Sequence, residues 1–399
     1  MDKRTLSVRT PDKAYEYDVG LFTSKSEPVT LAHLGHVVEM GERCLLNVIC
    51  VGSIDRARDP RFPFDFAERR DMWLASIPEG MRERFVIIGQ RDLGNGARWA
   101  SAVDRKVYEA AREAGIDLAE VKAAVFGHYK DSTSRYLDDF PGYELVNLPA
   151  YTAPDPARMR GDMPHLLSAS DVREGMFETG LSDLEEEWLE RVLVAVTPGV
   201  RDIIRDFVHG DEFPRLQEEY RRAKSAAAPW KVREYRDGPG LPHAINFNAA
   251  DPVVIHGNMI LMHQRDSFPG KDMWALPGVI IRADETAADA AIRGVVQKTG
   301  IDMTAGDLRQ SIVDQWFMDQ VQRSIRERTI SFPVLFQLGM HAKGRTAADR
   351  MKSRMLPRTK ATPRVGWFTP DEIEAMRHLI HEDHAIIIDQ ALERLRPRF

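Results

Sequence analysis

The sequence lacks the features of a secreted or membrane-inserted chain. Cys44 and Cys50 are the only cysteines among 399 residues, and both lie in one predicted strand, whose extended backbone holds them too far apart to form a disulfide. No apolar run approaches the ~20 residues that cross a bilayer, and the polar N-terminus has no apolar signal-peptide core. We therefore expect two buried thiols and a cytoplasmic protein without a membrane partner.

The charge balance gives no reason to expect a nucleic-acid partner. The net charge is -6, and residues 341–364, although basic, have no aromatic side chains between their charges. We interpret that segment as a solvated loop. The hydrophobic content of 43% is that of an ordinary globular protein, and the length predicts two domains.

Short apolar runs alternate with helical patterns over residues 1–181. The predicted strands are a run ending near Phe22 and the runs LLNVICVG, RFVIIGQ, AAVFGH and YELVNL. Apolar strands that alternate with helices are typical of a parallel sheet covered on both faces. The pattern predicts a doubly wound, Rossmann-like α/β domain whose ligand binds at the carboxyl ends of the strands.

The pattern changes twice after this domain. Residues 182–240 are helical and charged, with Pro198 and Pro214 at first-turn positions, and predict a helical connector. Residues 241–399 begin with a predicted hairpin turning at residues 256–258, continue with a helix from Glu285 to Lys298, and end in another helix. This order predicts an α+β domain.

The tetrapeptide His33-Leu34-Gly35-His36 follows the first predicted strand and opens the first predicted helix. A helix N-terminus offers unpaired N–H groups and a partial positive charge, which suit a phosphate. Two imidazoles one turn apart project toward one point, and Gly35 lets the backbone come close. In isolation the tetrapeptide also fits two core or surface histidines, but its location favours a phosphate site.

A second element, SASDVR at residues 168–173, lies near the end of the same domain. Ser170 is the predicted N-cap of the following helix, which places Arg173 in the first turn, where its fork-shaped guanidinium suits a phosphate. A cap beside a surface arginine would explain the hexapeptide alone. Because the same domain also carries the two histidines, we favour a phosphate-binding role for SASDVR.

HLGH and SASDVR together resemble the signature pair of the HxGH nucleotidyltransferases. GHYKDSTSRYLDDFPGYEL, from Gly127 to Leu145, resembles a run of the nicotinamide mononucleotide (NMN) adenylyltransferases. Residues 52–73 resemble their loop and helix after the second strand, and Trp99 matches a tryptophan that lies against the nicotinamide ring. One bacterial group fuses this enzyme to a C-terminal Nudix domain, so the resemblance spans essentially the whole chain.

The resemblance implies a transferase of NAD biosynthesis that converts ATP and NMN to NAD and pyrophosphate. Mg²⁺ would accompany ATP, and nicotinic acid mononucleotide is an alternative acceptor. The implied catalytic residues are His33, His36 and Arg173. The implied substrate-binding residues are Gly20, Phe22, Gly35, Trp99, Gly127, His128, Lys130, Asp131, Ser168 and Ser170.

The phosphate loop departs from the family pattern GxFxPxHxGH, in which arginine often stands second. Leu21 replaces that arginine, and residues from Thr23 to Ala32 form an insertion. Lys25 either supplies the missing charge or is merely solvated, and the sequence leaves both open.

Residues 275–302 resemble the Nudix box, GX5EX7REUXEEXGU with U apolar, preceded by LPG. Glu285 and Arg293 fit its first glutamate and its arginine, but Gly294, Gln297 and Lys298 replace the three later glutamates. Such helix carboxylates converge on divalent cations, whereas lysine repels them. We expect a Nudix fold with no metal ligands in its box, no ordinary hydrolase activity, and an ion pair one turn apart between Asp289 and Arg293.

Several alternatives stay open at this point. The C-terminal domain would bind ADP-ribose or NAD, or serve only as a packing partner, and in one alternative it still hydrolyses ADP-ribose. The HxGH chemistry also serves cytidylyl and pantetheine-phosphate transfer, although Trp99 and the GHYKD run argue against it. A nucleotide-sensing regulatory protein is the alternative from a different class. The sequence does not decide whether the chain forms a homo-oligomer.

Overall fold

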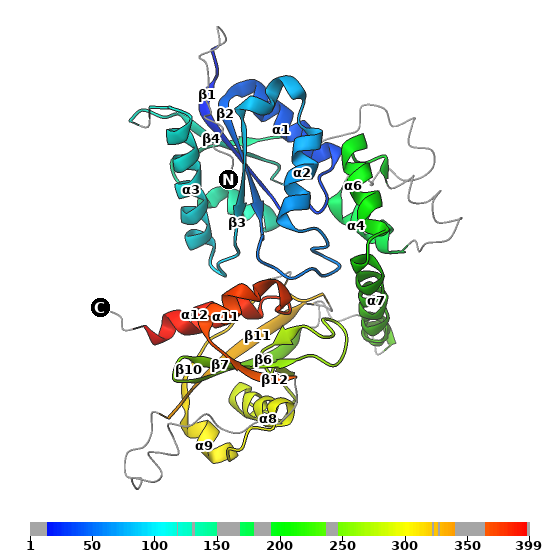
Figure 1. Cartoon of the computed structure of the whole chain (residues 1–399), viewed down its shortest axis with the longest axis vertical. Coiled ribbons are helices and arrows are strands. Elements are labelled where there is room, and N and C mark those ends of the chain that lie inside the picture. Colours follow the sequence, from blue (N-terminus) through cyan, green and yellow to red (C-terminus); the bar gives the residue numbers. More distant parts are fainter. Residues whose placement is uncertain are drawn as a thin grey trace. The chain divides into compact units, whose positions relative to one another are not determined.

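The computed structural model describes residues 14–117, 119–129, 132–149, 168–178, 193–236, 246–320, 323–325, 328–339 and 364–396. The chain divides into two compact units, Met1–Gln217 and Glu218–Phe399 (Figure 1). Their boundary falls within the predicted connector, while the predicted domain limits themselves stay predictions. Among the described residues, no helix is both long and apolar enough to span a bilayer.

The first unit is built on a five-stranded sheet. Its strands are β1 (Tyr17–Ser24), β2 (Cys44–Gly52), β3 (Phe85–Gln90), β4 (Ala123–Gly127) and β5 (Glu144–Asn147). They lie in the order β3-β2-β1-β4-β5, and every neighbouring pair is parallel. The strand order reverses direction between β1 and β4, which is where ligands bind in open α/β sheets. The predicted doubly wound domain is confirmed.

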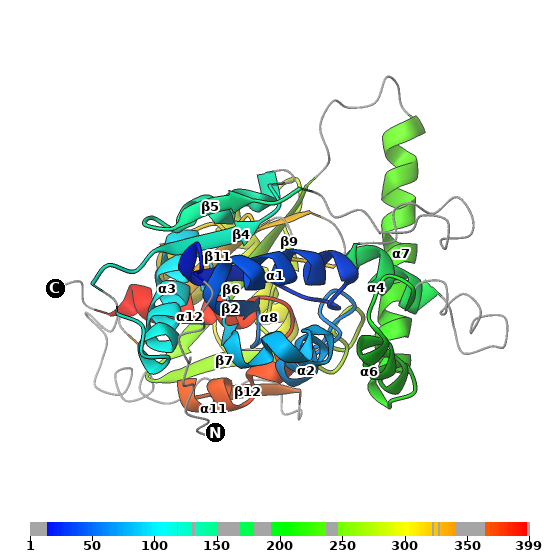
Figure 2. The same ribbon diagram turned by 90° about the horizontal axis from the view of Figure 1, so that it is seen from above.

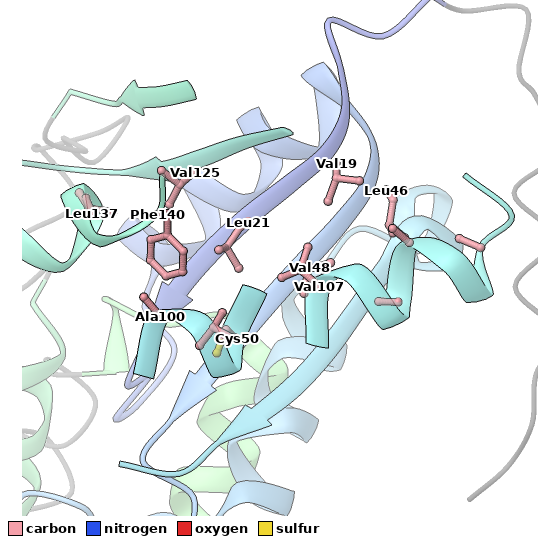
Figure 3. Close-up of a cluster of buried hydrophobic side chains, with 14 residues drawn as sticks. Val19, Leu21, Leu46, Val48, Cys50, Ala100, Val107, Val125, Leu137 and Phe140 are labelled. Atoms are coloured by element: carbon pink, nitrogen blue, oxygen red, sulfur yellow. The ribbon is translucent and has the colours of Figure 1, made fainter. Parts of the chain in front are cut away.

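Helices cover both faces of this sheet (Figure 1). Those that follow the strands are α1 (Leu31–Arg43), α2 (Phe66–Ser76) and α3 (Gly96–Glu113), with 3₁₀ turns η1 (Glu79–Arg84) and η2 (Ser132–Asp139). On the α3 face, Leu21 and Val48 of the strands pack with Ala100 and Val107 of the helix (Figure 3). This face is apolar because alternate strand residues point toward it.

Gly20 sets how closely α1 approaches the other face. A Cβ at Gly20 would lie 2.7 Å from Cγ of Met40 in α1 and 2.7 Å from Sγ of Cys44. Only glycine leaves room for this packing, which places the start of α1 beside the carboxyl end of β1. Cys44 and Cys50 are buried free thiols, as expected.

Three further helices follow, and the last of them runs from the first unit into the second. They are α4 (Ala169–Glu178), α6 (Pro198–Val208), which has its proline at the start, and α7 (Glu212–Arg236). Phe213 at the start of α7 stacks on Phe177 of α4, with ring centroids 5.5 Å apart, and also contacts Phe207 of α6. The three helices therefore form one cluster (Figure 2).

The second unit contains a seven-stranded mixed sheet. The main order is β10-β11-β6-β7-β12, formed by β10 (Ile312–Gln315), β11 (Thr329–Leu338), β6 (Phe247–His256), β7 (Met259–Gln264) and β12 (Val365–Phe368). The short strands β8 (Trp274–Ala275) and β9 (Val279–Ile280) pair with β7 and β6. The predicted β6–β7 hairpin is confirmed, with Gly257 in the left-handed region at φ 61°.

Helices cover both faces of this sheet as well. One face packs on α8 (Ala287–Thr299), which is followed by α9 (Ala305–Gln310). The other packs on α11 (Pro370–Ala375) and α12 (His384–Leu395), which the 3₁₀ turn η4 (Arg377–Leu379) separates. The predicted α+β domain is confirmed.

Candidate active site and the altered Nudix box

His33 joins the end of β1 to the start of α1. The helix begins at Leu31 with Thr30 as its N-cap, so His33 lies in the first turn rather than opening the helix. Its Nδ1 accepts from the Thr30 N–H at 3.1 Å, so the neutral ring carries its proton on Nε2, 3.2 Å from Oγ of Ser24. Burial, aided by His36, lowers the pKa of His33 to about 4. His33 is therefore a neutral ring at neutral pH.

His36 follows one turn later beside the same aromatic side chain. The centroids of His33 and His36 lie 6.3 and 6.2 Å from that of Phe22. Nε2 of His36 donates to the Pro149 carbonyl at 3.2 Å. Burial lowers the pKa of His36, and the bond to Pro149 opposes this shift. The structure therefore presents His36 as a neutral N–H donor.

His128 adds a third imidazole from the neighbouring strand. It follows β4, its ring centroid lies 6.4 Å from that of His36, and its Nδ1 donates to the Leu148 carbonyl at 2.8 Å. Gly127 has a packing role, because a Cβ there would lie 2.8 Å from Cδ2 of Leu137. Lys130 and Asp131, the next predicted residues, lie outside the described residues.

Arg173 reaches the inserted loop from α4. Its Nη1 donates to the Glu27 carbonyl at 2.9 Å, and its Nη2 donates to Oγ of Ser170 at 3.2 Å. The prediction that Ser170 is the N-cap is wrong. The helix begins at Ala169, and Oγ of Ser168 accepts the N–H of Asp171 at 3.1 Å, so Ser168 takes that role.

Lys25 lies in a group of cations that the sequence motifs did not predict. Its Nζ is 4.9 Å from the ring centroid of Phe62, and the guanidinium carbon of Arg56 is 4.4 Å from the same centroid. Although Lys25 is exposed, desolvation by the surrounding protein and the charge of Arg56 lower its pKa to about 8, and Arg61 and Arg173 also contribute. The run DRARDPR after β2 was the signal available for Arg56 and Arg61.

Trp99 lies half-buried on α3 against two aromatic rings from the η2 region. The centroids of Tyr136 and Phe140 are 6.4 and 5.9 Å away, both in edge-on geometry. The Tyr136 hydroxyl donates to the Thr23 carbonyl at 3.4 Å, so Trp99 is linked through Tyr136 to the end of β1. Its predicted contact with a base stays a prediction.

The remaining carboxylates of the Nudix box are already paired. Nε and Nη2 of Arg293 donate to the two carboxylate oxygens of Glu285 at 2.6 and 2.7 Å. These bonds lower the pKa of Glu285. Asp289 accepts from Oγ1 of Thr286 at 2.5 Å and pairs with Arg309 of α9. The expected Asp289–Arg293 pair is therefore wrong, because Arg293 turns back to Glu285.

Gly294, one of the substituted box positions, lets α8 lie against the LPG turn. A Cβ at Gly294 would lie 2.4 Å from the Pro277 carbonyl oxygen.

Lys298 lowers the pKa of His263 in β7. Burial is the larger cause and the charge of Lys298 the next, and together they lower this pKa to about 3. Within the described ranges, no group of three or more His, Cys, Asp or Glu is placed to hold a metal. Gly294, Gln297 and Lys298 do not fit a divalent cation.

The two folds and their sites define a class of protein. The first unit places imidazoles and cations where the strand order of a parallel sheet reverses, as nucleotide-binding α/β domains do. The second has a mixed sheet between helices and a box-like helix after an LPG turn. The chain thus combines a Rossmann-like nucleotidyltransferase fold with a Nudix fold.

Comparison with known proteins agrees with this class. The NUDIX domain family model matches residues 247–391, so the C-terminal half carries a NUDIX domain. The chain is 23% identical over 212 residues, 53% of its length and 98% of the relative's, to the nicotinamide/nicotinic acid mononucleotide adenylyltransferase of Acinetobacter baylyi. These matches confirm the resemblance predicted from the motifs.

Two solved structures match nearly the whole chain. Both are of a bifunctional NMN adenylyltransferase/ADP ribose pyrophosphatase from Francisella tularensis. The one complexed with AMP and a Mn ion has a TM-score of 0.74 and 24% identity, covering 95% of this chain and 99% of that chain. The other has a TM-score of 0.74 and 25% identity, covering 94% and 99%.

Proposed function

We propose that this chain is an NMN adenylyltransferase that makes NAD and pyrophosphate from ATP and NMN. The observation that carries the proposal is the meeting of His36, His128 and the loop of Lys25 at the carboxyl ends of β1 and β4. The curated relative, 98% of which this chain covers, is named for this activity on nicotinamide and nicotinic acid mononucleotides. Nicotinic acid mononucleotide is the alternative acceptor.

In this reaction a phosphate oxygen of NMN forms a bond to the α-phosphorus of ATP. The bond from that phosphorus to the bridging oxygen breaks, and pyrophosphate leaves with the electron pair. The protein's part in such transfers is positioning and charge stabilisation. The Nε2–H of His36 would donate a hydrogen bond to an α-phosphate oxygen in place of the Pro149 carbonyl, and His33 would hold the end of β1 through Ser24.

Cations and one aromatic ring would bind the remaining parts of the two substrates. Arg173, Lys25 and Arg56 would neutralise the β- and γ-phosphates, with Ser168 and Ser170 beside them. Trp99 would stack on the base of the acceptor. Mg²⁺ would be bound to the triphosphate of ATP and would lower the charge that the entering phosphate oxygen meets. The substrate-binding roles of Gly35, Gly127, Lys130 and Asp131 stay predictions.

For the Nudix domain we propose the absence of ordinary hydrolase activity. The support is chemical and steric. Gln297 and Lys298 offer no carboxylate, and Glu285 is held by Arg293. The Pro277 carbonyl occupies the space that a side chain at position 294 would need. The roles that remain for the Nudix domain are to bind ADP-ribose or NAD, or to support assembly of the protein, including assembly into a homo-oligomer. The second candidate is a bifunctional enzyme like the Francisella protein, whose name includes ADP ribose pyrophosphatase.

Two incubations of the purified full-length chain separate these candidates. ATP, Mg²⁺ and NMN should yield NAD and pyrophosphate in equal amounts, with nicotinic acid mononucleotide tested in parallel. ADP-ribose with Mg²⁺ or Mn²⁺ should remain intact. Failure to form either dinucleotide would refute the transferase proposal, and release of AMP from ADP-ribose would refute the proposed loss of hydrolase activity.

A further inference from the structure

Arg69 is a buried arginine that has no part in the chemistry proposed above. It lies on α2, and its side chain is only 2% exposed. Its nitrogens donate to the carbonyls of Gly52 at 2.7 Å, Lys25 at 3.0 Å, Ser53 at 3.0 Å and Asp65 at 3.2 Å. Its Nη1 also lies 2.9 Å from Oε1 of Glu27, which is equally buried.

These acceptors belong to two loops that are separate in sequence. Lys25 and Glu27 follow β1, whereas Gly52 and Ser53 end β2 and begin the loop that carries Arg56. The carboxyl ends of these parallel strands form the edge at which the nucleotide is proposed to bind. A guanidinium bonded to both loops links them, so that their spacing depends on Arg69.

Stability alone does not explain why Arg69 and Glu27 are buried side by side. Burial raises the pKa of Glu27 to about 8, although the charge of Arg69 opposes this shift, and buried ion pairs often stabilise a protein no more than apolar residues of similar volume. Glu27 is itself held, because its Oε2 accepts the N–H of Phe64 at 3.2 Å. The pair therefore connects the inserted loop, the loop after β2 and α2 at one point.

The same short stretch, Lys25 to Glu27, contacts the cations that are proposed to bind phosphate. Arg69 binds the carbonyl of Lys25, whose side chain lies over Phe62 together with Arg56. Arg173 binds the carbonyl of Glu27. A change at Arg69 is thus transmitted to Lys25 and Arg173 through at most two residues of backbone.

We propose that Arg69, paired with Glu27, is a positioning residue that holds the inserted loop so that Lys25 and Arg56 reach the β- and γ-phosphates of a nucleoside triphosphate. This inference rests on the proposed function. It gives the insertion from Thr23 to Ala32 a role, since the loop would supply by its own lysine the cation that is absent at Leu21.

The test is a double-mutant cycle on NAD synthesis by the full-length chain. Arg69→Lys should raise the KM for ATP about tenfold, a coupling in the range found for residues that act through one another. In the Lys25→Ala background the same substitution should raise that KM less than about twofold. Fully additive effects, or an unchanged KM for ATP in Arg69→Lys, would overturn the proposal.

Two further variants keep the result unambiguous. Arg84→Lys is the matched control, because Arg84 also donates to backbone carbonyls, those of Cys44 and Gly41, but where α1 ends and β2 begins. It should lower the melting temperature without changing the KM for ATP. If Arg69→Lys does not fold, Glu27→Ala takes its place, and a wild-type KM in that folded variant refutes the proposal. A wild-type chain that makes no NAD refutes the proposed function instead.

Discussion

Gly294 offers a direct test of how α8 sits on the LPG turn. In Gly294→Ala the new Cβ would lie 2.4 Å from the Pro277 carbonyl oxygen and 3.2 Å from Cγ1 of Val279. The first distance is far below a normal contact, and its partner is backbone, so α8 has to move. Overpacking of this kind costs about 1–3 kcal/mol, and the better helix propensity of alanine returns up to about 1 kcal/mol.

We therefore expect Gly294→Ala to destabilise the second unit by about 1–2 kcal/mol, which lowers its melting temperature by roughly 2–8 °C. Scanning calorimetry of the full-length chain measures this shift. The matched control is Gly306→Ala in α9, where the nearest atom to a new Cβ is Oγ1 of Thr304 at 3.7 Å, so no destabilisation is expected. A Gly294→Ala variant as stable as the wild type would refute the close approach.

Three further predictions concern charges near the two sites. Lys25→Ala should raise the KM for ATP about tenfold, the scale of a lost charged hydrogen bond. Because the pKa of Lys25 is about 8, the wild-type KM for ATP should rise as the pH passes 8, whereas that of Lys25→Ala should stay flat. The folded-state pKa of His33, about 4, lies below its unfolded value. Its stabilisation should therefore be complete above pH ~6.5 and decline toward pH 4 by at most roughly 3 kcal/mol. Urea unfolding at several pH values, with His33→Gln lacking that slope, checks this. Arg293→Ala should cost about 1 kcal/mol in the same unfolding assay, because Glu285 then keeps only its bond from the Arg282 N–H; no loss of stability would count against a structural role for the pair.

The sequence was sufficient for most of the fold because hydrophobic periodicity determines it. The apolar runs around Phe22 and Cys50 became parallel strands, and the hairpin at Gly257 turned where glycine allows a positive φ. Helix starts were harder to predict. Ser170 and Ser168 are both good capping residues, and which one caps depends on where the preceding chain places the helix, which propensity alone does not contain.

The candidate site was predictable only where a local motif marks it. His33 and His36 are neighbours in sequence, but the approach of His128 follows from β4 pairing with β1, and the cation group around Phe62 follows from how two loops fold together. The partner of Asp289 was missed for a similar reason, because Arg309 reaches it from another helix and one-turn spacing cannot reveal that.

The central claim is that the Nε2–H of His36 donates a hydrogen bond to the reacting phosphate of ATP. The most direct measurement is the rate of NAD formation from ATP and NMN by His36→Ala, compared with the wild type at equal folded concentration. We expect kcat to fall by about 10²–10³-fold, as when a single donor to a transition-state oxyanion is removed, while the melting temperature changes little. Near-normal NAD formation by this variant would contradict the account.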